Sequence, residues 1–143
     1  ASHSWNTEGN YEIRVKARDE NGGESPWSDP LLINILKAPT MDIGLITGGF
    51  FKVNAVIKNI GAVDSAEVSW SISLDGGVWI GKETTGTITS LAAGGEDTIS
   101  SDFILGWGET RVTVRAEITE GSDSRSQRGK LYLFYVQVNP GGV

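Results

Sequence analysis

Strict alternation of apolar and polar side chains in several short segments is the feature that most constrains the fold of this chain. Residues 111–118 read RVTVRAEI, residues 67–74 read EVSWSISL and residues 11–18 read YEIRVKAR. A period of two is typical of β-strands that turn one face to a core and the other to water. Sustained helical periodicity occurs nowhere. The sequence therefore predicts an all-β protein.

Nine strands are predicted, separated by turns in which glycine is common. A short linker, residues 37–40, follows the first two strands, and its Pro39 cannot donate to a ladder. The other seven are spaced as in an antiparallel sandwich. The predicted strands are residues 11–18, 31–36, 41–46, 51–59, 67–74, 78–88 with a break near Gly81, 97–105, 111–118 and 129–138.

Three further expectations concern the part after the linker. Trp70 lies mid-strand among inward-facing residues, so we expect it to be a core tryptophan. Residues 120–129, EGSDSRSQRG, contain no apolar side chain and predict an exposed, mobile loop. Residues 130–138, KLYLFYVQV, are apolar on both faces, which indicates a central strand or one with a covered outer face.

Short motifs along residues 41–138 have a recognisable order. A strand ends in Asn-x-Gly at residues 59–61, a bridge of small residues follows, the next strand ends in Asp-Gly at 75–76, and a Leu-Ala-x-Gly turn occupies 91–94. This pattern resembles the CARDB-like cell-adhesion-related domain of bacteria and archaea. The resemblance implies an immunoglobulin-like antiparallel β-sandwich of about seven strands. It also implies a spacer or adhesive role and brings no catalytic residues.

The first part of the chain resembles the end of another sandwich. His3, Trp5, Gly9, Tyr11 and Asp19 match in order the C-terminal part of a PKD domain. The same stretch is similar to the last two strands of a fibronectin type III domain, through YEIRVKA and GGESPWSDPL. We therefore expect residues 1–37 to be a two-stranded C-terminal fragment of a second sandwich, of either family, and residues 38–143 to be the CARDB-like domain.

A two-stranded fragment is only marginally stable in water. We expect it to dock on the second domain, to pair with another chain, or to be poorly ordered. The first residues, ASHSW, are interpreted as a boundary inside a longer protein, so that an upstream secretory signal is compatible with the sequence.

Charge and composition narrow the range of partners. The net charge is −6, with 4 basic and 6 acidic residues in 1–37 and 8 basic and 12 acidic residues in 38–143. An acidic balance without a basic stripe argues against nucleic acid. No stretch approaches the roughly 20 apolar residues of a membrane helix, so no membrane insertion is expected in this segment. The chain has no cysteine, which excludes disulfides and thiolate zinc sites.

Tryptophans provide the candidate ligand-binding residues. Trp27, Trp79 and Trp107 lie in or beside predicted loops. An exposed indole could stack on the apolar face of a sugar ring, or each could plug an end of a sandwich, which is the favoured interpretation. If a sugar platform exists, Trp79 and Trp107 are the better pair.

The sequence contains few residues in patterns typical of a metal site or a catalytic site. Asp19, Asn21 and Glu24 offer oxygen ligands for calcium, but their spacing does not match an EF-hand and a solvated hairpin loop is favoured. His3 is the only histidine, and neither a phosphate-binding loop nor a nucleophile elbow occurs. We expect no enzyme activity, no cofactor and no metal.

The function expected from these observations is a non-catalytic structural or adhesion module of an exported or cell-surface prokaryotic protein. Its partners would be other surface-protein domains of the same chain, and possible ligands are polysaccharide or protein. The alternative is a carbohydrate-binding module that uses exposed tryptophans, in some cases as an accessory to a secreted hydrolase. Exposed edge strands also allow a weak homodimer.

Overall fold

The structure, a computed structural model, describes residues 2–140. The chain divides into two compact units, Ala1–Lys37 and Ala38–Val143, and each is considered by itself. Every ladder is antiparallel, and the described residues contain strands and turns but no helix. Residues 2–140 accordingly include no helix long and apolar enough to cross a membrane. The all-β prediction is confirmed.

The first unit is built on one hairpin. Strands β1 (Gly9–Ile13) and β2 (Leu31–Ile35) pair over five residues. The predicted strand 11–18 is too long, because the regular ladder ends at Ile13. Beyond it, the Ser28 and Ser25 hydroxyls accept the backbone N–H groups of Val15 and Ala17, in place of ladder partners.

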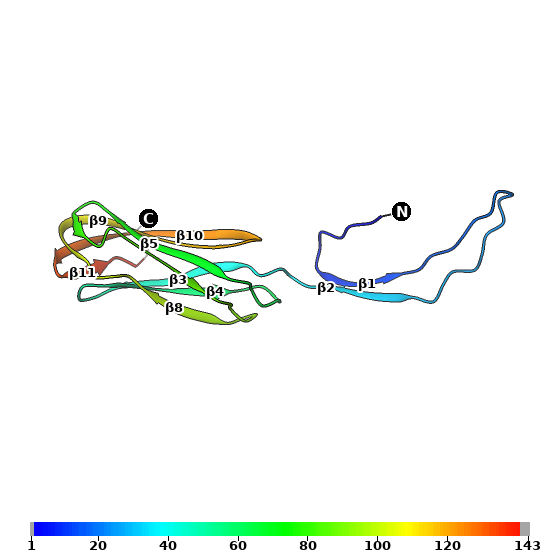
Figure 1. Cartoon of the computed structure of the whole chain (residues 1–143), viewed down its shortest axis with the longest axis horizontal. Coiled ribbons are helices and arrows are strands. Elements are labelled where there is room, and N and C mark those ends of the chain that lie inside the picture. The colour runs from blue at the N-terminus through cyan, green and yellow to red at the C-terminus, as the bar shows by residue number, and fades with distance from the viewer. Residues whose placement is uncertain (1, 141–143) are drawn as a thin grey trace. The chain divides into compact units, whose positions relative to one another are not determined.

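The second unit has two sheets. The larger has the order β11-β10-β9-β5-β7, with β6 paired to the start of β9, and the smaller has the order β3-β4-β8. Figure 1 labels β5, β9, β10 and β11 of the larger sheet and the three strands of the smaller one. The strands are β3 (Met41–Gly48), β4 (Val53–Asn59), β5 (Val68–Asp75), β6 (Val78–Ile80), β7 (Glu83–Ile88), β8 (Glu96–Ser100), β9 (Leu105–Ile118), β10 (Gly121–Leu133) and β11 (Tyr135–Val138). The predicted break near Gly81 separates β6 from β7.

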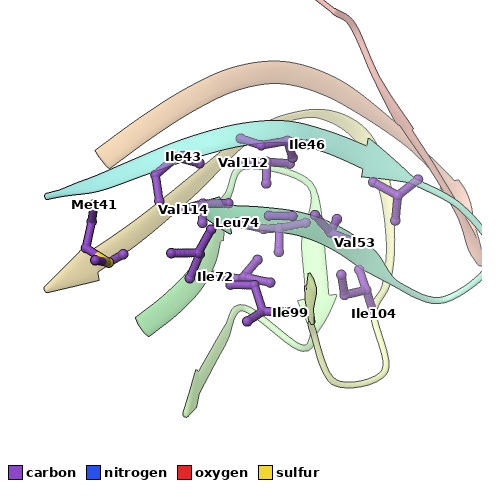
Figure 2. Packing of buried hydrophobic residues seen from close by; sticks show 14 of the residues in the cluster. Met41, Ile43, Ile46, Val53, Ile72, Leu74, Ile99, Ile104, Val112 and Val114 are labelled. Atoms are coloured by element: carbon purple, nitrogen blue, oxygen red, sulfur yellow. The ribbon is translucent and has the colours of Figure 1, made fainter. Parts of the chain in front are cut away.

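Both sheets contribute to one apolar core. The side chains that meet in Figure 2 include Ile43 and Val53 from the three-stranded sheet and Ile72 and Val114 from the larger sheet. Within residues 111–118 every second side chain is buried, as the alternation predicts. Burial of such side chains contributes about 1.5–3 kcal/mol each, which makes this core the main stabilising element of the unit.

Trp70 lies at the margin of the core and not at its centre. It faces inward from β5 but is only half-buried, whereas its neighbour Ile72 is fully buried. Gly86 on the end strand β7 is its ladder partner, and a Cβ there would lie 2.4 Å from Cζ2 of the indole. The expectation of a core tryptophan therefore holds in part, because the indole packs against the core but is not fully buried. The indole packs over Gly86 of β7, the last strand of the larger sheet, where the absence of a side chain leaves room for it.

Gly86→Ala is expected to lower the free energy of unfolding by about 1–3 kcal/mol, because the new methyl group forces the Trp70 indole out of its position. Denaturant unfolding of the full chain measures the effect. Gly121→Ala is the matched control, since nothing lies within 4 Å of a Cβ at that position. Equal stability of the two variants would contradict the packing of Trp70 on Gly86.

The predicted mobile loop 120–129 belongs to a long strand. Strand β10 pairs with β9 from Gly121 onward, and its polar side chains also reach β3. The Ile43 N–H donates to Asp123 Oδ2 at 2.8 Å, and Arg125 Nη1 donates to the Gly44 carbonyl at 3.0 Å. The prediction was wrong because backbone pairing and these cross-sheet hydrogen bonds, not apolar side chains, stabilise this half of the strand.

The apolar segment 130–138 is a hairpin instead of a single strand. Strand β10 ends at Leu133 and β11 returns along it at the end of the larger sheet. Leu133 has a left-handed backbone (φ 58), which the sequence does not signal because glycine or asparagine usually occupies such positions. The outer face is uncovered, with Tyr132 40% and Tyr135 39% exposed. The expectation of a covered outer face is therefore wrong, and the expectation of a central strand holds only for residues 130–132, which have β9 on one side and β11 on the other.

The buried side chain of Asn59 joins two of the short motifs. Its Oδ1 accepts the N–H groups of Thr40 and Gly61, at 3.1 and 3.0 Å. Its Nδ2 donates to the carbonyls of Val63 and Leu91, at 2.8 and 3.0 Å. One amide thus connects the Asn-x-Gly segment to the start of the Leu-Ala-x-Gly turn, which gives a physical reason for both motifs.

Candidate functional site

Trp79 and Trp107 share the outer face of the larger sheet. Val78 pairs with Gly106, and both are buried, so Trp107 points outward; the β6–β9 register shifts between Val78 and Ile80, and the exposure of Trp79 at this irregularity places it on the solvent side as well. Both indoles are 61% exposed. Because β6 and β9 are adjacent, the two tryptophans occupy diagonal positions on one surface.

Three more aromatic residues continue this surface across the sheet. Tyr132 is the ladder partner of Trp107, and their ring centroids lie 6.2 Å apart. Tyr132 pairs in turn with Tyr135, whose ring lies 5.1 Å from that of Phe50. Phe50 is 67% exposed and bridges to Tyr135 through the backbone. We call this set the aromatic row; its members are Trp79, Trp107, Tyr132, Tyr135 and Phe50.

A second set of side chains lies beside the aromatic row on the same face. Lys130 pairs in register with Glu109 on β9 and with Gln137 on β11, and we call these three residues the polar row. The Lys130 ammonium lies 3.7 Å from the Glu109 carboxylate, and the Tyr132 hydroxyl donates to Gln137 Oε1 at 3.3 Å. Aromatic and polar side chains therefore form two adjacent lines across three strands.

Next to the polar row the surface is hollowed. One depression, of about 390 Å³, lies elsewhere on the sheet and has Trp70, Arg115 and Glu117 among its serine and threonine side chains, and another, of about 370 Å³, lies beside the polar row. Its lining residues are Asp75, Glu109, Thr110, Arg111 and Arg128. Glu109 belongs to both the polar row and the depression, so that the two are continuous.

The chain segments behind the aromatic row have a strained backbone. Phe51 and Leu133 are the non-glycine residues with positive φ in the described part of the chain, at 61° and 58°. Each costs on the order of 1–2 kcal/mol for a bulky L-residue. The Phe51 N–H donates to the Phe134 carbonyl at 2.7 Å, and the Val136 N–H donates to the Gly49 carbonyl at 2.8 Å. These bonds fix the segment that carries Phe50 against the β10–β11 hairpin.

The calcium candidates form a hydrogen-bonded turn. Asp19 Oδ1 accepts the N–H groups of Asn21 and Gly23, at 2.9 and 2.8 Å. Glu24 pairs with Lys16. Within residues 2–140 no group of three or more His, Cys, Asp or Glu side chains is placed to hold a metal ion. The carboxylates of Asp19 and Glu24 thus already have partners within the hairpin.

Two other residues singled out in the sequence lie in the first unit. Trp27 is 59% exposed, with the Lys16 ammonium 5.0 Å from its ring centroid. His3 contacts the edge of Trp5, with ring centroids 4.6 Å apart. Trp27 has no aromatic neighbour among the ring contacts of the described residues, which distinguishes it from Trp107.

Sequence reasoning found two members of the aromatic row and missed three. Tyr132 and Tyr135 fall in a segment that is apolar on both faces, and Phe50 lies in a short connection. The only sequence signal for the two tyrosines was the unexplained outer face of KLYLFYVQV, and Phe50 had none. A scan against models of protein families finds no match to this chain. A search of curated proteins finds no significant match either.

Proposed function

We propose that residues 38–143 form an immunoglobulin-like sandwich of the CARDB type. It serves as a non-catalytic spacer or adhesion module of an exported or cell-surface prokaryotic protein. The observation that carries this proposal is the ladder between β9 and β10. It pairs thirteen residues without a register shift, from Ile118 with Gly121 to Gly106 with Leu133. Such a ladder, fixed to a core shared by two sheets, gives the unit a regular and cooperatively folded frame, which is what a spacer requires.

Two features support the family assignment and the partners. Asn59 joins two motifs on which the resemblance rests. Strands β7 and β8 each have one ladder neighbour in the described part of the chain, so that their second edges can accept a strand. Other domains of the same protein, or a second copy in a weak homodimer, are the partners that we propose for these edges.

Stretching the full chain in optical tweezers tests the spacer role. Residues 38–143 are expected to unfold in one cooperative event that releases roughly 30–35 nm of chain, at about 3.5 Å per residue less the folded length. Gradual lengthening in many small steps would contradict the proposal. Antibody labelling of intact cells tests the surface location, and labelling that appears only after lysis would contradict that part.

Carbohydrate binding is the second candidate function. It is favoured by the position of Trp79 and Trp107 on one outer face with equal exposure. Binding and spacing are compatible, because the ladders that transmit load lie behind the face that carries the tryptophans.

A further inference from the structure

We infer that the aromatic row and the polar row together bind a linear, hydroxyl-rich polysaccharide that lies across the strands of the larger sheet. The inference rests on the carbohydrate-binding function proposed above and extends it from two tryptophans to eight side chains. It also specifies the direction of the ligand and the groups that contact its hydroxyls.

The shape of the aromatic row fits a chain better than a compact ligand. One aromatic side chain comes from each of five neighbouring segments, namely β6, β9, β10, β11 and the connection that contains Phe50. Four strand spacings of about 4.8 Å span roughly 19 Å across the sheet, and Trp79 is displaced along its strand because it lies diagonal to Trp107. The row is one side chain wide. Consecutive sugar rings of one chain could each place the C–H groups of one face on an aromatic side chain.

The polar row adds charged and amide groups that can form hydrogen bonds with the ligand's hydroxyls. Glu109 accepts hydrogen bonds, Lys130 donates them, and the amide of Gln137 does both. A sugar hydroxyl is both donor and acceptor, so it can bond to any of the three. The Tyr132 hydroxyl already contacts Gln137 at 3.3 Å, which places the two rows within reach of one ring.

The same charges argue against a wholly apolar partner. The Glu109 side chain is 80% exposed and that of Lys130 46% exposed. A lipid surface, or the aromatic row of a second copy, would remove these groups from water without replacing their hydrogen bonds, which is unfavourable. A polysaccharide covers the rings and at the same time provides hydroxyls for the charged groups.

The backbone segments behind the aromatic row are ordered before any ligand binds. Backbone hydrogen bonds hold the Phe50 segment and the β10–β11 hairpin in fixed positions, and they maintain the left-handed conformations of Phe51 and Leu133. A surface that is ordered before binding loses less conformational entropy when the ligand arrives. Strain of this kind is concentrated at binding sites.

Affinity electrophoresis of the full chain tests the inference, in gels that contain hydroxyethylcellulose, xylan, mixed-linkage β-glucan or galactomannan. Retardation is expected in at least one gel. Titration with oligosaccharides of that polymer should show affinity that rises with length until the row is covered. Trp107→Ala, Tyr132→Ala and Gln137→Ala should each weaken binding about tenfold or more. Trp27→Ala, which removes an equally exposed indole elsewhere, should leave binding unchanged.

The outcomes separate this inference from the function on which it rests. No retardation in any gel overturns both. A second outcome is that retardation is lost in the double variant Trp79→Ala/Trp107→Ala but is unchanged in Tyr132→Ala and Gln137→Ala. This result would keep carbohydrate binding by the two tryptophans and overturn the inference that the aromatic row and the polar row bind together. A dimer that Tyr132→Ala abolishes, without sugar binding, assigns the face to a second copy and also overturns the inference. Denaturant midpoints equal to those of the unsubstituted chain show that the variants are folded.

Discussion

Asn59→Leu is expected to lower the free energy of unfolding of residues 38–143 by at least about 4 kcal/mol. The substitution keeps a side chain of similar size but removes four hydrogen bonds, and Asn59 is fully buried. A buried polar group left without a partner costs about 1–3 kcal/mol. The N–H groups of Thr40 and Gly61 and the carbonyl of Val63 lose their partner at once, whereas the Leu91 carbonyl keeps the Ser65 N–H.

Equilibrium unfolding of the full chain in urea, followed by tryptophan fluorescence, measures this loss. Asn54→Leu is the matched control on the same strand. Asn54 is partly exposed, and its side-chain oxygen accepts a single hydroxyl, that of Ser100, at 2.6 Å. The control is expected to lose no more than about 1 kcal/mol. A similar loss in both variants would show that Asn59 does not hold the two turns together.

Ile72→Ala is expected to cost about 3–4 kcal/mol, within the range for buried aliphatic residues reduced to alanine. Ile72 has no exposed surface and pairs in register with Val114 at the centre of the larger sheet. The loss is a large part of the roughly 5–15 kcal/mol that stabilises a typical domain. The same urea experiment measures it, as a lower midpoint with an unchanged slope.

Leu45→Ala serves as the control for Ile72→Ala. Leu45 is also a large aliphatic residue within a strand, but it is 57% exposed. Its truncation is expected to change stability by no more than about 0.5–1 kcal/mol. If both substitutions had equal effects, Ile72 would not be a core residue.

Part of the candidate site could be predicted from the sequence. The exposed tryptophans 79 and 107 stood out because they lie in or beside predicted loops. Tyr132 and Tyr135 did not, because a segment that is apolar on both faces is also typical of a buried strand. The left-handed Leu133 decided between these two structures, and it is held by contacts with the rest of the fold and not by its own preference.

The sequence by itself determined that the chain forms strands and which side chains of segments such as 111–118 face the core. Period-two alternation is a local property, and burial of one face follows from it directly. Only the tertiary structure decided that 121–129 is part of a strand, and that Phe50, Trp79, Trp107 and the two tyrosines share one surface. These residues are far apart along the chain. Their proximity depends on strand order and register, which non-local hydrogen bonds and core packing determine together.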